Sequence, residues 1–232
     1  MLNCLQLIQR VCKRIGISVP NAAYTSSDLQ VQQLVELANE EGQEQASRYQ
    51  WQALQREATF TTVAAELQTS LAAITTGAGW IVNQTIWNRT LRRPVYGPDS
   101  LQDWQQQKAI QIAGPFNRYR IIANNIRFYP VPAAGQDCYF EYITNQWTAA
   151  GGTEYQSDTD TSLLDDTTMI LGAIWRWKQA KGMTYAEDFA KYERRIAELL
   201  QRDAVKPTLS MTGTMYDVVP LVVVPSGSWN QP

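Results

Sequence analysis

The strongest constraint on the fold is a change of periodicity along the chain. Apolar residues recur with helical spacing near both ends, whereas the middle carries short runs rich in Thr, Tyr, Ile and Phe that glycine and proline interrupt. The sequence predicts an α+β protein, mainly α, in which two N-terminal and two C-terminal helices form a bundle around an antiparallel β-rich insert. The expected division is a helical bundle of residues 1–56 and 158–203, an insert of residues 57–157, and an extended C-terminal arm of residues 204–232.

Capping residues set the predicted ends of the first two helices. Asn3 caps the first helix, and Gly16 ends it in the left-handed conformation. Ser27 and Gln30 form a capping box for a second helix that runs to about Trp51. The polar side of this second helix is interpreted as a solvated face, and it consists of Glu36, Asn39, Glu40, Glu41, Gln43 and Glu44.

Two more helices are predicted near the C-terminal end of the chain. Asp165 or Asp166 caps the first of them, and Gly182 ends it. On this helix Trp175 and Trp177 point different ways, so we expect one in the core and the other against a neighbouring helix or chain. The last helix has the apolar spacing of an antiparallel helix pair, with Tyr185, Phe189, Tyr192, Ile196 and Leu199 on its seam.

The clearest strand signal in the insert is a hairpin. Residues 119–123 and 126–129 are joined at Asn124-Asn125, and asparagine tolerates the positive φ of a two-residue turn. Residues 138–143 are predicted as a third strand. The three strands are expected to form a small antiparallel meander.

The arm, residues 204–232, has a composition of its own. It contains the β-prone run 216–224, and its charged residues are Lys206 and Asp217. Pro220 excludes this run from a central strand. The arm is too apolar for an ordinary disordered tail, so its side chains require a surface in their own domain or in another protein. The expected contact residues are Tyr216, Val218, Leu221, Val223 and Trp229.

Catalytic and metal chemistry find little support in the sequence. The chain has no histidine, which removes the most common general base, the Ser-His-Asp triad and nearly every catalytic zinc site. Leu163 and Met169 stand where an EF-hand calcium loop that begins at Asp158 requires glycine and glutamate. Helix capping is therefore the favoured interpretation of the acidic group, and we predict no catalytic residue, metal ligand or cofactor. The acidic group is Asp158, Asp160, Asp165 and Asp166.

The cysteines and apolar runs favour a soluble intracellular protein. Cys4 and Cys12 are separated by about 12 Å along one predicted helix, which is too far for a disulfide. The third cysteine, Cys138, makes the count odd, and no signal peptide is recognised, as expected for a reducing cytosol. The longest apolar run is far too short to span a bilayer.

Arg89, Arg92 and Arg93 form the dense basic group of the sequence. Three interpretations stay open: they contact phosphates, they pair with acids across a subunit boundary, or they form a solvated β-edge that discourages aggregation. The net charge of −2 and a pI near 5.3 argue against tight binding to a DNA backbone.

Several stretches together resemble one protein family. They are LVELANEEG at 34–42, TIWNRTLRRPVYGP at 85–98, DWQQQKA at 103–109, FYPVPAAG at 128–135, DTDT at 158–161, LGAIWRWK at 171–178 and YAEDFAKY at 185–192. The chain is similar in these stretches to the head-to-tail adaptor, or head-completion, proteins of tailed bacteriophages, especially those with short tails. The likeness spans roughly residues 2–203, and its motifs concern packing rather than catalysis.

The resemblance implies a structural protein of the virion neck, between capsid and tail. Such adaptors assemble as a dodecameric ring on the portal protein, and the tail hub or nozzle protein attaches below. The ring extends the channel through which double-stranded DNA is packaged, retained and ejected, without sequence-specific binding. The expected partners are thus further copies of the chain, the portal, the tail hub and passing DNA, with no membrane, and assembly takes place in the bacterial cytoplasm. The arm would then contact the portal or the adjacent subunit, and the basic group would supply intersubunit or channel charge.

Two other classes of protein stay open. A virion-associated cell-wall hydrolase is the strongest competitor, because paired acids are the catalytic groups of glycosidases, and activity on peptidoglycan would identify it. A packaging accessory that binds nucleic acid would need an affinity that falls steeply with salt, and the composition argues against it.

Overall fold

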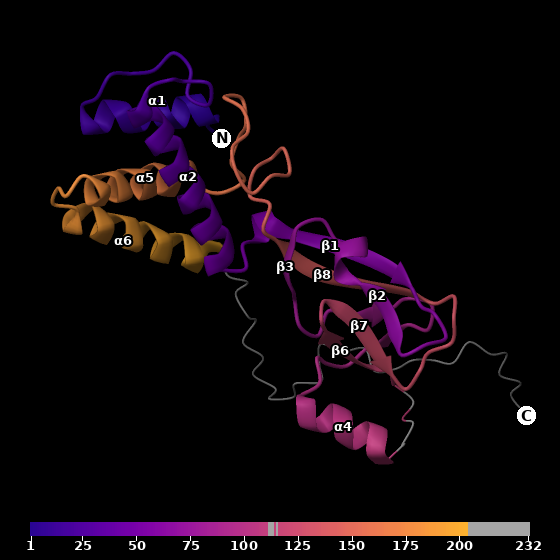
Figure 1. Cartoon of the computed structure of the whole chain (residues 1–232). Helices are drawn as coiled ribbons and strands as arrows, with labels where there is room; N and C mark the ends of the chain where they lie inside the picture. Colours follow the sequence, from indigo (N-terminus) through magenta and orange to yellow (C-terminus); the bar gives the residue numbers. More distant parts are fainter. Residues whose placement is uncertain (111–113, 115, 204–232) are drawn as a thin grey trace, which may run out of the picture.

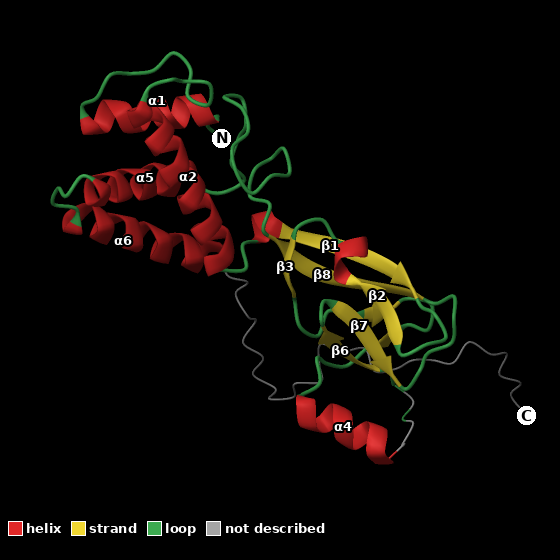
Figure 2. Ribbon diagram, viewed as in Figure 1, coloured by secondary structure: helices red, strands yellow, loops and turns green. Residues whose placement is uncertain are grey.

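The computed structural model describes residues 1–110, 114 and 116–203, and within them it confirms an α+β fold with antiparallel sheets. Four helices lie together on one side of the molecule and the sheets lie on the other (Figure 1, Figure 2). The four helices are α1 (Cys4–Ile15), α2 (Leu29–Arg48), α5 (Asp166–Ala180) and α6 (Ala186–Asp203). No helix in the described residues is both long and apolar enough to cross a membrane.

Helix α5 is the centre of the helical side, because it packs against α1, α2 and α6. Its buried residues Met169 and Ala173 share one apolar core with Leu7 and Val11 of α1 and Leu34 of α2. Burying an aliphatic side chain of this size stabilises a fold by about 1.5–3 kcal/mol. This core therefore joins α1 and α2 to α5, which is far from them in the sequence.

The predicted caps of α1 and α5 are confirmed. The side chain of Asn3 accepts an N–H bond from the first turn at 2.8 Å, and Gly16 adopts a φ of 78°. Asp165, rather than Asp166, caps α5, and it accepts the backbone N–H of Thr168 at 3.0 Å.

The predicted ends of α2 were wrong. Asp28 is its cap and accepts the N–H of Gln30 at 2.9 Å, so the capping box at Ser27 does not form. The helix ends at Arg48 rather than near Trp51. Trp51 is buried directly before the short 3-10 helix η1 (Gln52–Leu54), which carries the chain toward the sheets.

The seam between α5 and α6 is buried only along part of its length. Tyr192 and Ile196 are buried against Trp175 of α5. Tyr185 and Phe189, nearer the turn between the helices, are 37% and 39% exposed. The apolar spacing thus predicted the pairing of the helices, but the pairing leaves this end of the seam open to solvent.

Both tryptophans of α5 are covered within the chain. Trp175 packs on α6, and Trp177 belongs to the core that α1 and α2 share. The expectation that the two side chains point different ways is confirmed, and the partner of Trp175 is a neighbouring helix.

Strand β8 (Asp137–Thr144) is the centre of the larger sheet. On one side its residues 137–143 pair with β1 (Gln55–Thr61), and on the other side it pairs with β3 (Ala78–Ile81) and β4 (Trp87–Asn88). Beyond β4 lies β5 (Arg93–Pro94), so the path runs β1-β8-β4-β5.

The second sheet has the order β2-β7-β6. Its strands are β2 (Leu67–Ser70), β7 (Asn125–Tyr129) and β6 (Arg118–Ile122). Two short helices complete this side, α3 (Leu71–Ile74) and α4 (Leu101–Ile110). Phe60 and Phe140 of the larger sheet and Phe128 of the smaller one belong to one buried core, with ring centroids 5.8 and 6.2 Å apart for the pairs that include Phe60.

Two details of the predicted strands were wrong. The hairpin between β6 and β7 turns at Ala123-Asn124, whose φ angles are 49° and 60°, and Asn125 is paired with Ile122. The third strand of the expected meander, β8, pairs with β1 in the other sheet rather than with β7. The meander failed because a strand buried in mid-sheet takes its neighbours from distant segments, which local sequence does not reveal. The division of the chain into domains stays a prediction.

Candidate functional site

The basic group lies at the β4–β5 hairpin, on an edge of the larger sheet. Arg89 follows β4, Arg92 adopts a φ of 54° in the turn, and Arg93 belongs to β5, the last strand of the path. The guanidinium of Arg89 stacks 3.5 Å from the ring centroid of Tyr139 and pairs with Glu57. Arg89 therefore has an acidic partner within its own chain.

An aromatic side chain is exposed beside this group. Trp87 lies opposite Tyr139 in the pairing of β4 with β8, and Trp87 is 40% exposed. Tyr139 in turn lies opposite Thr59 of β1, so these side chains share the outer face of the larger sheet. The face combines an exposed indole, a stacked arginine and threonines, a mixture typical of the contact surfaces of proteins.

The four carboxylates of the acidic group all accept hydrogen bonds from backbone N–H groups, and one of them also pairs with an arginine. Asp158 accepts the N–H groups of Ala23 and Tyr24 at 3.0 and 2.7 Å. The other three make comparable bonds: Asp160 with residues 156 and 157, Asp165 with Thr168 and Arg195, and Asp166 with the N–H of Leu2. The group therefore ties together the N-terminal segment, the loop before α5 and α6. Capping, the favoured interpretation, is confirmed for Asp165.

The described residues offer no reactive thiol and no metal cluster. Cys4, Cys12 and Cys138 are buried and unpaired. Burial raises the pKa of Cys4 and of Cys138 to about 12, so these thiols stay protonated and unreactive at neutral pH. No group of three or more Cys, Asp or Glu side chains in this part of the chain is arranged to hold a metal ion.

A buried ion pair inside the helical bundle was not predicted. Glu41, which was interpreted as part of a solvated face, is fully buried, and Nε of Arg176 donates to its carboxylate at 3.0 Å. Gln45 also donates to Glu41. Burial raises the pKa of Glu41, and the bonds from Gln45 and Arg176 only partly offset this rise.

The sequence does contain a signal for this pair. Glu41 and Gln45 continue the phase of the buried residues Leu34 and Ala38, so they lie on the inner side of α2. Opposite them, a Cβ added to Gly172 would lie 2.1 Å from the carboxylate carbon of Glu41, so only glycine leaves room for it. Asn39 is likewise buried, and its side chain accepts the N–H of residue 155 at 3.0 Å.

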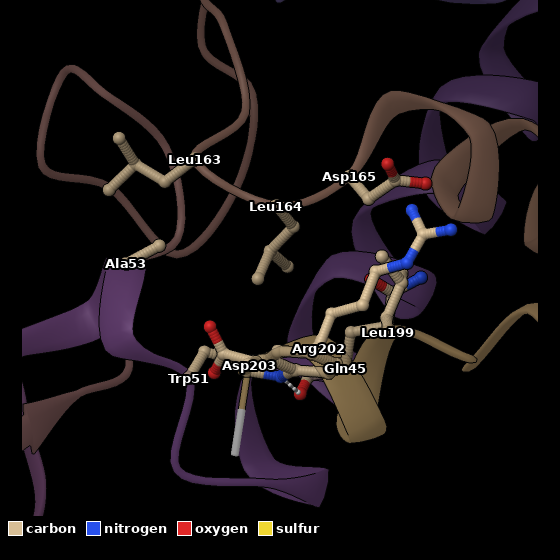
Figure 3. A pocket seen from close by; sticks show the side chains of 9 residues that line it. All are labelled: Gln45, Trp51, Ala53, Leu163, Leu164, Asp165, Leu199, Arg202 and Asp203. Atoms are coloured by element: carbon tan, nitrogen blue, oxygen red, sulfur yellow. Dashed lines mark hydrogen bonds between the residues drawn. The ribbon is translucent and has the colours of Figure 1, made fainter. Parts of the chain in front are cut away.

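A hollow of about 250 Å³ lies where α2, η1, the loop before α5 and the end of α6 meet (Figure 3). Trp51, Leu164 and Leu199 form its apolar wall, while Arg202 and Asp203 lie at the end of α6. A second hollow of about 300 Å³ shares Asp203 and leads toward the first residue of β1. The described chain therefore ends in a groove between the helices and the larger sheet.

A hydrogen bond between distant residues lies beside these two hollows. The side chain of Asp203 accepts the backbone N–H of Gln52 at 3.0 Å, which fixes the end of α6 three residues before β1 begins. The predicted contact residues of the arm, from Tyr216 to Trp229, lie outside the described residues, so they stay a prediction. No sequence pattern indicated the contact of Asp203 with Gln52.

A sequence model of the family described as SU10 adaptor protein matches residues 2–213 of the chain. The matched range includes every described helix and strand and ends before the β-prone run of the arm. A search of curated proteins found no match.

Proposed function

The chain belongs to the SU10 adaptor protein family, and on this basis we propose that it forms a ring beneath the portal of a tailed bacteriophage and provides the attachment site for the tail. The observation that carries the proposal is the family match, which extends over nearly the whole chain. In this role the protein is a structural component of the virion neck, assembled with the portal, the tail hub and further copies of itself.

The physical character of the chain supports passage of DNA without tight binding. Its net charge is −2, so a ring of such subunits has no excess of positive charge to retain a polyanion. In the dense basic group, Arg89 is already paired with Glu57. We propose that the group, Arg89, Arg92 and Arg93, faces a subunit boundary or the channel wall and contributes positive charge there. A dodecameric ring and an arm that contacts the portal and the adjacent subunit belong to the same proposal.

The competing hydrolase has less support. A retaining or inverting glycosidase needs two carboxyl groups that face a cleft and are free to exchange protons. The acids that suggested this class are bonded to backbone N–H groups and to Arg195. We expect the unchanged protein to cleave peptidoglycan no faster than a blank without protein. The Asp158→Asn and Asp160→Asn variants should give the same result. Cleavage by the unchanged protein that both substitutions abolish would favour the hydrolase.

The direct test is electron microscopy of the purified protein mixed with its portal. We expect a ring of added density on one face of the portal, absent when the portal is imaged alone. The matched control is the adaptor imaged without the portal, which shows whether the protein forms rings or aggregates by itself. Portal particles that remain bare at micromolar adaptor concentrations would refute the proposed function.

A further inference from the structure

Strand β1 has a free edge in the described structure. It is the outermost strand of the larger sheet, and among the described strands it pairs only with β8. It runs for seven residues, Gln55–Thr61, and its register with β8 has no bulge. A regular edge of this length presents a row of N–H and C=O groups that is a template for another strand.

The hydrogen bonds show which residues of β1 direct their backbone N–H and C=O groups away from β8. The N–H of Thr62 donates to the C=O of Gln136 at 2.8 Å, which continues the register of β1 with β8. Bonded pairs alternate in an antiparallel ladder, so the even-numbered residues of β1 bond to β8 and the odd-numbered ones face away. The far side of β8 agrees, because the C=O of Glu141, an odd-numbered residue, accepts the N–H of Val82 there at 2.9 Å.

The outward C=O of Gln55 accepts a bond from the side chain of Arg56 at 2.9 Å, but few features protect the rest of this edge against pairing. The outward-facing residues include Glu57, Thr59 and Thr61, and no proline or glycine interrupts the strand. The carboxylate of Glu57 is engaged by Arg89 rather than directed outward as a free charge. Thr59 and Thr61 are strand-forming residues, so the second half of the edge suits an incoming strand.

The described chain ends close to this edge. Asp203 is bonded to Gln52, just before β1, so the arm leaves the fold at the first end of the free strand. Residues 204–215 span up to roughly 40 Å when extended, which is enough to reach a neighbouring subunit. The run that follows has strand-forming side chains and Asp217 as its one charge.

We propose that the free edge of β1 binds residues 217–223 of a second copy of the chain, which add to the larger sheet as a further strand. The inference rests on the ring assembly proposed above, and it names the contact that links adjacent subunits. Donor and acceptor are different surfaces of one chain, and a contact of this kind builds a ring when the rotation from one subunit to the next closes around an axis. The family model ends at residue 213, so the donor strand lies outside the part of the chain that the family defines.

Pro220 fixes which side of the donor strand meets β1. Proline has no N–H, so residue 220 and the others of its parity must direct their N–H positions away from β1. Val219, Leu221 and Val223 then present their N–H and C=O groups to β1. On the outer edge of the added strand the missing N–H of Pro220 discourages further pairing, so that the addition stops at one strand.

Hydrogen exchange measures the proposed contact directly. In the isolated subunit, kept monomeric at low concentration, the amides of Glu57, Thr59 and Thr61 should exchange fast while those of Ala58 and Phe60 are protected by β8. In the assembled ring on its portal, the three outward amides should become protected. A matched pair of variants completes the test: Val219→Pro removes an N–H that faces β1 and should abolish this protection, whereas Val218→Pro removes one that faces away and should retain it.

The possible results separate this inference from the proposed function. A ring that forms on the portal while the three outward amides still exchange fast would refute the β1 contact and leave the adaptor function intact. Slow exchange of these amides in the monomer would show that the arm pairs with its own chain, which also refutes the contact between copies. Equal protection in the Val218→Pro and Val219→Pro rings would refute the assigned register. Absence of any ring would refute the proposed function, and this inference with it.

Discussion

Removing Arg176 should leave an unpaired charge inside the helical bundle. The Glu41 carboxylate is fully buried, and Arg176 is the cation beside it, with Nη2 of Arg176 at 2.9 Å from Oε2 of Glu41. Breaking a buried ion pair by removing one partner costs about 3–5 kcal/mol. The free energy of unfolding of native domains is about 5–15 kcal/mol, so we expect Arg176→Met to remove a large part of the stability at neutral pH.

The pH dependence distinguishes an unpaired charge from lost packing. Burial raises the pKa of Glu41 above its ordinary value of 4.5, so the folded state binds a proton more readily than the unfolded state. This contribution to stability is present at a pH below the unfolded pKa and is lost as the pH rises through the raised folded pKa. Without Arg176 the pKa of Glu41 should rise further. The loss in Arg176→Met should therefore be largest near pH 7.5 and should shrink toward pH 5.

Urea unfolding followed by far-ultraviolet circular dichroism at both pH values measures this effect. The double variant Glu41→Gln/Arg176→Met buries no charge at this position and should recover most of the loss. Lys191→Met, which breaks the exposed pair of Lys191 with Glu187, is the control for a charge removed from the surface and should leave the midpoint unchanged. A loss in Arg176→Met below about 1 kcal/mol, or one that is the same at both pH values, would refute the reasoning.

Three further substitutions test the packing and the caps by the same unfolding assay. Gly172→Ala adds a methyl group that would clash with the Glu41 carboxylate, so it should lower the free energy of unfolding by about 1–3 kcal/mol. An unchanged unfolding midpoint would mean that α2 and α5 are farther apart. Phe189→Ala should cost about 1–2 kcal/mol, less than a buried phenylalanine, because Phe189 is 39% exposed and its ring lies 5.2 Å from that of Trp175. Asp165→Ala should cost about 1–2 kcal/mol at neutral pH. Burial opposes ionisation of Asp165, but bonds from Arg195 and Thr168 lower its net pKa, so the loss should diminish as the pH falls through that pKa; a loss that persists in acid would contradict this.

The helices were predictable because their signals are local. Asn3, Gly16 and Asp165 act through bonds within one turn of the helix, so the residue types near each helix end predict them, although Asp166 was an equal candidate for the cap of α5. The cap of α2 was misplaced by one residue because Ser27 and Asp28 are both good capping residues, and sequence alone does not decide between neighbours. Glu41 was misassigned for a different reason. A carboxylate is interpreted as exposed unless a buried partner for it is known, because charged side chains are almost never fully buried without one. The partner of Glu41 is Arg176, which is far away in the sequence.

The pairing of the strands was less predictable, because paired strands lie far apart in the sequence. The hairpin of β6 and β7 was recognised from residues adjacent in sequence, apart from a shift of its turn by one position. The pairing of β8 with β1 joins residues such as Phe140 and Ala58 across the entire insert, and no turn residue specifies it. The basic group was found from sequence, whereas the stacking of Arg89 on Tyr139 depends on this distant pairing.

The same non-local pairing connects the fold to the proposed assembly. By taking β1 as its outer neighbour, β8 leaves the opposite edge of β1 without a partner among the described strands, and that edge starts beside the residue where the described chain ends. Had β8 joined β7 in the expected meander, β1 would have had no described partner and the edge beside Asp203 would not exist as a rigid strand. A rigid acceptor costs less entropy to bind than one that must be ordered at the same time as the arm. The topology of the larger sheet therefore supplies a preformed acceptor for the subunit contact, the edge of β1, and only the donor strand in the arm has to become ordered on binding.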